Sequence, residues 1–424
     1  MKIAIVSKSD RNGGGASRVA EDLAAWLNDA GHPTDHFIAL NYKEPLSFQH
    51  SLYGEGSRLK LCKKIHQKTN NYGFPELLPV EYWFNLSRVI DNYDIVHFHD
   101  LFTTISPITL ALVSRRKPTF FTVHDCSPFT GGCLYPMECG KFTSYCHKCP
   151  QLPQNGWKNQ LHDHTREVQA IKRWVSGQFN IRYIFPSHWI AQQAQQALKF
   201  KISPVVIPNG LDLKPFPAVS KRDVKRNLGI PENRKVVVIA ASYFLDDPRK
   251  GVKYAVAALQ NVRDLSPFIL VVGHCNEELR QALDGFEFKE MGYIKDPNFL
   301  AQVYSAADVM LFCTLADNLP LTVMEAMAAS TPVVGFSTGG VPEMIQTGRN
   351  GILVEPTNQR ALNQALSQAL LYADLETMGQ QARKDVENNF SRTIFLEKHL
   401  QLYQNIEHSI EGKMENCSFQ QTFA

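Results

Sequence analysis

The chain has 424 residues, of which 44% are apolar and 20% are charged, a composition typical of soluble globular proteins and unlike that of disordered ones. Its net charge is only +3, which argues against a nucleic-acid-binding protein with a broad basic surface. The length predicts two lobes, each with its own core. No apolar run suits a signal peptide or a transmembrane helix, so we expect a cytoplasmic protein.

The first half of the chain alternates strand patterns with helical ones, which predicts a doubly wound parallel α/β sheet in a lobe spanning 1–208. An apolar strand at 2–7 is followed by a helix at 14–30, which ends before Gly31. The further strands are predicted at 35–40, 94–99, 118–123, 181–185 and 204–208, with helices at 105–114 and 188–198.

The second half repeats this alternation and predicts a second Rossmann-like lobe at 209–390. Its opening stretch, up to about residue 233, is rich in Pro, Lys and Asp and is the candidate linker. Strands are predicted at 236–240, 268–272, 308–312, 331–336 and 351–356, with helices from Val252, Glu277 and Pro320. A C-terminal helix at 391–410 is expected to pack back on the first lobe, before a loose tail at 411–424.

The most specific motif is the segment 317–328, which begins with Asp317 and carries Glu325 eight positions later. Pro320 is expected in the first turn of a helix, where proline is well tolerated. Glu325 would then lie about 7–8 Å further along the helix axis. The alternative is an acidic residue at a helix start and a partly buried glutamate, neither with a ligand.

The start of this helix is a candidate phosphate site. Backbone N–H groups at Asn318, Leu319 and Leu321 can hold a diphosphate, because the helix dipole favours an anion there. Glu325 can accept hydrogen bonds from ribose hydroxyls, as the acidic residue of dinucleotide-binding folds does. Asp317 would face the donor sugar, so the spacing suits an extended nucleotide sugar.

Several motifs together resemble the retaining glycosyltransferases of family 4, which have the GT-B fold. They lie at 207–212, 247–251, 306–308, 317–325, 338–343 and 350–354. The resemblance implies a hexosyltransferase that needs no metal cofactor for catalysis and binds its donor in a cleft between the lobes. The family commonly has Glu at the position of Asp317, which is one methylene shorter.

Arg249 and Lys250 lie just before the helix that begins at Val252, where a cation can neutralise a donor diphosphate. The alternative is a solvated basic surface. The family often has a further arginine at the position of Phe244, so Arg249 is a possible substitute for it.

His124 follows the predicted strand 118–123, at the carboxyl end where open α/β sheets place ligands. The resemblance puts a matching histidine beside the donor sugar, which makes His124 and Asp317 the catalytic candidates. The alternative is a structural histidine. His97 and His99, in the preceding strand, are expected to be packing or cleft-wall residues.

The glycine run at 13–15 joins the first strand to the first helix and lets a ligand approach the backbone closely. It lacks the spacing of a dinucleotide fingerprint, and the resemblance assigns Gly14 and Gly15 to the acceptor or the sugar. A merely flexible turn is the alternative.

Five cysteines lie within 24 residues, between Cys126 and Cys149. A structural zinc ion bound by Cys133, Cys139, Cys146 and Cys149 is the leading interpretation, with unmetallated thiols, an iron–sulfur cluster or a redox disulfide as alternatives. The insert at about 126–150 resembles a colanic-acid or exopolysaccharide subgroup of the family.

The motifs predict transfer of a sugar from a nucleotide-sugar donor to a hydroxyl of a glycan or lipid-linked acceptor. The resemblance implies that this transfer belongs to exopolysaccharide or cell-surface polysaccharide biosynthesis. The basic and apolar run at 58–68 could rest on the inner face of an anionic plasma membrane, although a solvated helix explains it too. The rival functions are a GT-B phosphorylase or epimerase and a non-catalytic sugar-nucleotide sensor.

Overall fold

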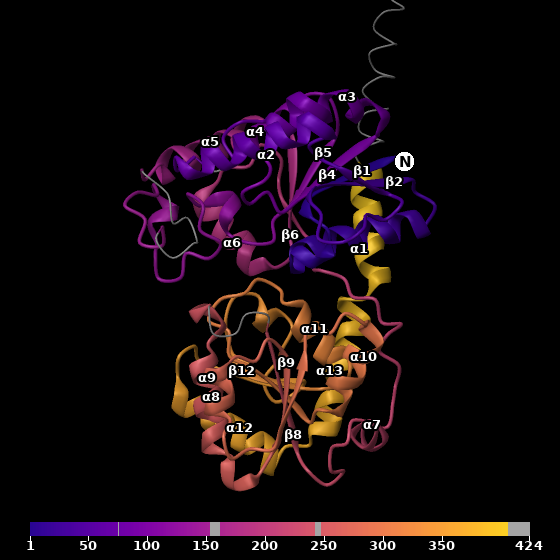
Figure 1. Cartoon of the computed structure of the whole chain (residues 1–424), viewed down its shortest axis with the longest axis vertical. Coiled ribbons are helices and arrows are strands. Elements are labelled where there is room, and N and C mark those ends of the chain that lie inside the picture. The colour runs from indigo at the N-terminus through magenta and orange to yellow at the C-terminus, as the bar shows by residue number, and fades with distance from the viewer. Residues whose placement is uncertain (75, 153–161, 242–246, 406–424) are drawn as a thin grey trace, which may run out of the picture. The chain divides into compact units, whose positions relative to one another are not determined.

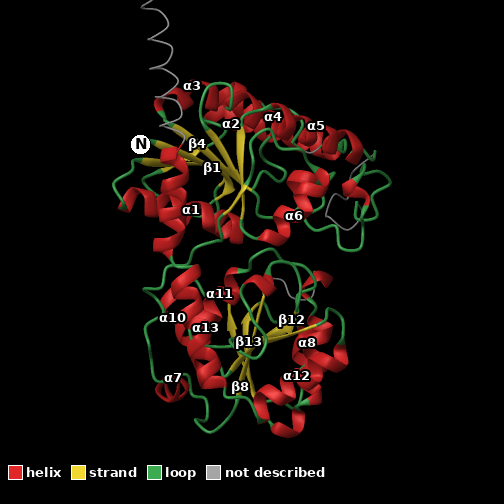
Figure 2. Cartoon of the chain, turned by 180° about the vertical axis from the view of Figure 1, so that it is seen from behind, coloured by secondary structure: helices red, strands yellow, loops and turns green. Residues whose placement is uncertain are grey.

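The computed structural model describes residues 1–74, 76–152, 162–241 and 247–405. The chain forms two compact units: Met1–Pro208 together with the segment from Phe395 onward, and Asn209–Ile394. In each unit, helices cover both faces of a sheet (Figures 1 and 2). Both sheets are built from parallel pairings, so that helices are needed on both sides to bury them.

The first unit contains seven strands in the order β3-β2-β1-β4-β5-β6-β7. They are β1 (Ile3–Ser9), β2 (Thr34–Leu40), β3 (Gln49–Ser51), β4 (Ile95–His99), β5 (Thr119–Thr122), β6 (Ile181–Phe185) and β7 (Val205–Val206). The strand order reverses between β1 and β4, and ligands of open α/β sheets bind beside the carboxyl ends of strands at such a switch point.

The helices of this unit are α1 (Gly15–Asp29), α2 (Gly56–Asn71), α3 (Ser87–Val89), α4 (Pro107–Val113), α5 (Thr165–Gln178) and α6 (His188–Ala197). Successive strand residues serve opposite faces of the sheet. Phe121 of β5 therefore packs in one core with Leu110 of α4 and Val175 of α5, whereas the adjacent Phe120 meets Tyr403 at a ring-centroid distance of 4.9 Å.

Tyr403 belongs to the last described helix, at 392–405. Phe395 in the same helix lies edge-on to Trp26 of α1, with ring centroids 5.8 Å apart. This C-terminal segment therefore completes the core of the first unit. None of the helices in the described ranges is both long and apolar enough to cross a membrane.

The second unit has six strands in the order β10-β9-β8-β11-β12-β13. They are β8 (Val236–Ala241), β9 (Phe268–Gly273), β10 (Phe288–Gly292), β11 (Val309–Phe312), β12 (Val333–Phe336) and β13 (Gly351–Val354). The order again reverses once, between β8 and β11, which places the switch point of this unit there.

The helices of the second unit divide between two cores. They are α7 (Lys221–Asn227), α8 (Val252–Asn261), α9 (Glu277–Ala282), α10 (Pro297–Ala306), α11 (Leu321–Ala328), α12 (Gln359–Leu371) and α13 (Leu375–Asn389). One core joins α10, α11 and α13 to the sheet through residues such as Val238, Tyr304 and Met324. The other joins α8, α9 and α12 to its opposite face.

Two local expectations were wrong. The candidate linker contains α7. It buries Phe216, which precedes this helix, and Val224, which lies in it, in the core of the second unit, so a few apolar contacts anchor a mostly charged segment. Pro320 is not inside the first turn of α11 but is its N-cap, with extended backbone angles of φ −69° and ψ 125°.

Candidate active site

In the second unit, three loops meet at the carboxyl ends of β8, β11 and β12. Lys250, from the loop after β8, pairs with Asp317, from the loop after β11, through Nζ and Oδ2 at 3.0 Å. The two side chains are only about one-fifth exposed, at 22% and 18%. The pair therefore lies at the switch point of the sheet and brings together two residues that are 67 positions apart.

Arg249 links these loops through hydrogen bonds, and its side chain is 22% exposed. Its guanidinium donates to Asp247 Oδ2 at 2.8 Å and to the carbonyl of Ala316 at 2.9 Å, while its own carbonyl accepts from Leu315 N at 2.7 Å. Phe244, where the family often has another arginine, lies outside the described residues.

Glycine is required where the loops touch. Gly251 has φ +67°, and a Cβ there would lie 1.9 Å from the carbonyl oxygen of Cys313. Gly339, in the loop after β12, has φ +57°, and its Cβ would lie 1.7 Å from the carbonyl oxygen of Asp317. Both are left-handed conformations that favour glycine, so backbone contact fixes the spacing of the loops.

The segment from Asp317 to Glu325 leads into α11. Asp317 Oδ1 accepts from the backbone N–H of Asn318 at 3.0 Å, so this N–H is already paired. Leu319 is buried in the core, and its carbonyl accepts from Asn209 Nδ2 at 3.2 Å. Glu325 lies within α11 and is buried, with 2% of its surface exposed.

In the first unit, the glycine run forms the turn between β1 and α1. Gly14 is the N-cap of α1, with φ +117°, and a Cβ at Gly14 or Gly15 would meet no atom within 4 Å. At Gly13 it would lie 1.6 Å from Ser9 Oγ. The structure thus separates a packed glycine from two glycines that border open space.

His124 lies two residues beyond β5 and contacts His99, the last residue of β4. The rings share a hydrogen bond of 3.0 Å between His99 Nδ1 and His124 Nε2. Burial lowers the pKa of His124 to about 3, and the neighbouring His399 adds to the effect. At neutral pH His124 is therefore an uncharged imidazole.

The sequence reasoning missed Asp100, which lies at the same edge of this sheet. Asp100 follows β4 directly and has a positive φ of 41°. Burial raises its pKa to about 7, against the opposing charge of Lys8 at the end of β1. Burial also raises the pKa of Asp125. Asp100 carried the same signal as His124, since each follows a predicted strand.

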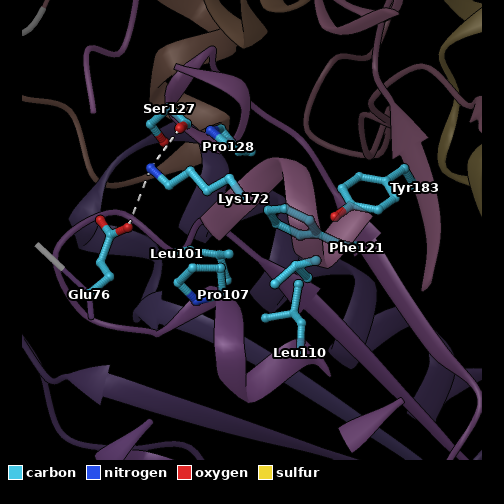
Figure 3. A pocket seen from close by; sticks show the side chains of 10 residues that line it. Glu76, Leu101, Pro107, Leu110, Phe121, Ser127, Pro128, Lys172 and Tyr183 are labelled. Atoms are coloured by element: carbon cyan, nitrogen blue, oxygen red, sulfur yellow. Dashed lines mark hydrogen bonds and ion pairs between the residues drawn. The ribbon is translucent and has the colours of Figure 1, made fainter. Parts of the chain in front are cut away.

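A buried ion pair between Lys172 and Glu76 connects the loop at Ser127 with the loop at Thr103; the pair and Ser127 are shown in Figure 3. Lys172 of α5 donates to the carbonyl of Ser127 at 2.9 Å and lies 3.7 Å from Glu76 Oε2. Glu76 accepts in turn from the backbone N–H of Thr103, and Ser127 N donates to Asp125 at 2.7 Å. No local sequence pattern reveals this pair, because its members are far apart in the chain.

The four predicted zinc ligands line one cavity of about 20 Å³, with Cys133, Cys139, Cys146 and Cys149 around it. Burial raises the pKa of the Cys133 thiol to about 12, so that thiol is protonated at neutral pH. Among the residues that the structure describes, no three His, Cys, Asp or Glu side chains are grouped closely enough to hold a metal ion.

Two family patterns match consecutive parts of the chain. Residues 13–215 match the pattern described as Glycosyltransferase Family 4, and residues 234–371 match Glycosyl transferases group 1. The gap between the two matches, from residue 215 to residue 234, lies close to the boundary between the two units.

Individual relatives are distant. A D-inositol 3-phosphate glycosyltransferase of Corynebacterium urealyticum is 27% identical over 39% of this chain and 42% of its own length. A putative colanic acid biosynthesis glycosyltransferase, WcaL of Escherichia coli, is 27% identical over 34% of this chain and 40% of its own length. The matched part of the chain thus spans about two fifths of each relative.

Solved structures match nearly the whole fold. Sucrose-phosphate synthase from Thermosynechococcus elongatus has a TM-score of 0.72 at 19% identity, covering 96% of this chain and 100% of that one. HepE of Anabaena in complex with UDP has a TM-score of 0.63 at 18% identity, with the same coverage.

Two doubly wound parallel units with C-terminal helices, matched in this way, define a glycosyltransferase of the GT-B fold. The predicted fold class is confirmed. The chain belongs to glycosyltransferase family 4, in the group 1 glycosyl transferases.

Proposed function

We propose that this glycosyltransferase moves a sugar from a nucleoside diphosphate sugar to a hydroxyl of a glycan or lipid-linked acceptor, with retention of configuration. The observation that carries the proposal is the Lys250–Asp317 pair at the switch point of the second unit. A cation and a carboxylate beside the start of α11 suit a ligand that carries both phosphate and sugar hydroxyls.

Lys250 is proposed to exchange Asp317 for the donor diphosphate. The departing diphosphate gains negative charge, and a cation already in place stabilises that charge without reorganisation. The exchange releases Asp317, whose carboxylate then accepts from hydroxyls of the sugar. Arg249 supports this step by holding the loop through Asp247 and Ala316.

Glu325 is proposed to bind the ribose, with backbone groups of Asn318, Leu319 and Leu321 near the phosphates. The first N–H groups of a helix lack intrahelical partners and attract anions. The N–H of Asn318 contributes only after it leaves Asp317 Oδ1. The UDP complex of HepE supports a nucleoside diphosphate ligand for this fold.

On the first unit, His124 is proposed to contact the transferred sugar, and Gly14 and Gly15 to border the acceptor or sugar. The open space around the two glycines supports this assignment. Burial lowers the pKa of His124 to about 3, so its imidazole is a weak base. It is therefore proposed to interact through hydrogen bonds, while the departing diphosphate takes the acceptor proton.

We place the activity in exopolysaccharide or other cell-surface polysaccharide synthesis, on the inner face of the plasma membrane. The resemblance of the cysteine insert and the match to WcaL support the pathway. Helix α2 supports membrane contact, because Lys60, Lys63 and Lys64 are exposed there beside Leu61, which is 44% exposed. Co-sedimentation with anionic but not neutral vesicles, weakened in K60E/K64E, tests this contact.

A panel of UDP-, GDP- and ADP-sugars, scored by donor hydrolysis and by transfer to lipid-linked acceptors, tests the proposed reaction. One donor class should be consumed, and Lys250→Ala should reduce its turnover roughly 10²–10³-fold, as for loss of one preorganised charge-stabilising group. Lys253→Ala, at an exposed lysine in α8, is the matched control.

Other outcomes select the rivals. Dependence on free phosphate would identify a phosphorylase, and epimerised donor would identify an epimerase. Tight donor binding without turnover would identify a sensor. Equal turnover by wild type and Lys250→Ala would contradict the proposed donor site.

A structural zinc ion in the cysteine insert is a separate proposal, supported by the four thiols around one cavity. Binding requires the thiols to converge and to release their protons. Metal analysis of the purified chain should find about one zinc per chain, which is lost in Cys146→Ser. Much less than one zinc in the wild type rejects the site.

A further inference from the structure

The imidazole ring of His99, at the end of β4, contacts the ring of His124, two residues beyond the end of β5. His99 pairs in register with Thr122 of β5, and its ring is stacked on that of His124 with centroids 5.3 Å apart and planes inclined by 25°. The bond between His99 Nδ1 and His124 Nε2 is 3.0 Å long. One nitrogen of the two must carry the proton in this bond.

Both rings are neutral near pH 7. Burial lowers the pKa of His99 and of His124, and the neighbouring histidines lower them further. A neutral imidazole has one N–H donor and one acceptor nitrogen. The direction of the shared bond therefore fixes the tautomer of both side chains at once.

Whether His99 Nδ1 donates or accepts in this hydrogen bond follows from the surroundings of its other ring nitrogen, Nε2. His99 Nε2 is buried and has no hydrogen-bond partner among the residues that the structure describes. If His99 Nδ1 accepted the bond, its proton would lie on Nε2 as an orphaned buried N–H, which is rarer in proteins than an unpaired acceptor. If Nδ1 donates, only a lone pair is left unpaired.

Two other buried histidines also leave an acceptor nitrogen, and not an N–H group, without a partner among the described residues. His399 Nδ1 must donate to the carbonyl of Phe395, at 2.8 Å, and His66 Nε2 must donate to Glu81, at 3.1 Å. In each ring the other nitrogen is buried and unpaired among the described residues. The proton follows the hydrogen bond in both cases.

We propose that His99 is a positioning residue, which donates Nδ1–H to His124 Nε2 and thereby holds His124 in its Nδ1–H tautomer. The proposal deepens the proposed function and rests on it for the role of His124 in transfer. In this tautomer Nδ1 of His124 carries the proton and can act only as a donor. Its Nε2 is occupied and is not available as a general base.

Long-range ¹H–¹⁵N correlation spectra of the full chain labelled at histidine test the tautomer directly. We expect His124 at pH 7.5 to show a protonated Nδ1 and an unprotonated Nε2, with His124→Gln used for assignment. His399 is the internal reference, because its carbonyl partner forces the same tautomer. A wild-type His124 protonated on Nε2 overturns the proposal.

Variants at His99 supply a second readout. In His99→Asn the amide nitrogen retains a donor near the position of Nδ1, so the tautomer and kcat of His124 should be kept. His99→Leu should switch the tautomer and reduce kcat roughly tenfold, the effect of about one hydrogen bond. His274→Leu, at an exposed histidine of the second unit, is the matched control.

The two readouts separate the two claims. If His99→Leu switches the tautomer of His124 but leaves turnover unchanged, His99 is a positioning residue and His124 takes no part in the reaction. An unchanged tautomer in His99→Leu contradicts the positioning role, whatever the activity. The wild-type spectrum remains decisive if His99→Leu does not fold.

Discussion

The first unit buries charged and imidazole side chains near the carboxyl edge of its sheet, whereas the second holds the Lys250–Asp317 pair on loops above two mainly aliphatic cores. Glu76, His99 and Lys172 are each less than 5% exposed in the first unit. Lys250 and Asp317 in the second are partly exposed. Buried polar contacts resist rearrangement, while a partly exposed pair can exchange partners when a ligand arrives.

The largest expected effect concerns the buried ion pair. Burial raises the pKa of Glu76, and the charge of Lys172 opposes this shift. Lys172→Met leaves the buried Glu76 without its cationic partner and should lower the free energy of unfolding by about 3–5 kcal/mol. Denaturant titration measures the loss. The double variant Glu76→Gln, Lys172→Met should recover much of it, and failure to recover would show that the pair does not act as a unit.

Glu325 provides the corresponding test in the second unit. Glu325→Gln should reduce the preference for a donor with intact ribose hydroxyls over its 2′,3′-dideoxy analogue by about 1.5–3 kcal/mol, the range for a hydrogen bond to a charged group. Competition binding with both donors measures this preference. An unchanged preference would place the ribose elsewhere.

Gly251→Ala should lower the stability of the second unit by about 1–3 kcal/mol, because alanine is strained at φ +67°. Its Cβ would also force the loops apart at Cys313. Thermal unfolding together with donor affinity measures both consequences. Gly292→Ala, at a similar φ of +62° but in open space, separates backbone strain from the collision.

A further effect is a dependence of the stability of the first unit on pH. Burial lowers the pKa of His36 and of His399 to about 4, so below pH 6.5 the unfolded chain takes up protons that the folded chain does not. Each such histidine lowers stability by about 1.4 kcal/mol per pH unit between pH 6 and 5. Asp100, whose pKa is raised to about 7, contributes in the opposite direction.

Single variants isolate the histidine contribution. His399→Leu should flatten the pH dependence of the unfolding free energy by about that amount. Phe395→Leu, in the same helix, removes no titratable group and should lower stability equally at all pH values. An unchanged slope in His399→Leu would contradict the lowered pKa.

Much of the architecture followed from the sequence, because buried parallel strands are continuous apolar runs. The strands at 236–240 and 268–272 were predicted nearly to the residue. Edge strand β10 was missed, since Lys289 and Glu290 are exposed and its pattern is polar. Helix α7 was missed because Val224 is the main apolar contact of a highly charged segment.

Candidate site residues could be proposed from the sequence only where they follow strands or lie just before helices. Lys250 and His124 were proposed in this way, and Asp100 could have been. The bond between His99 and His124 depends on the pairing of two strands, and the Lys172–Glu76 contact depends on the packing of α5. Such contacts join distant positions and leave no local pattern in the chain.

The return of the last described helix to the first unit has a consequence for biosynthesis. Tyr403 bonds His97 through its hydroxyl group at 2.6 Å and packs on Phe120, yet it leaves the ribosome about 280 residues after Phe120. The second unit is contiguous in the chain and can close first. The first unit acquires these core residues only after the whole second unit has been synthesised, so its imidazole network is assembled last.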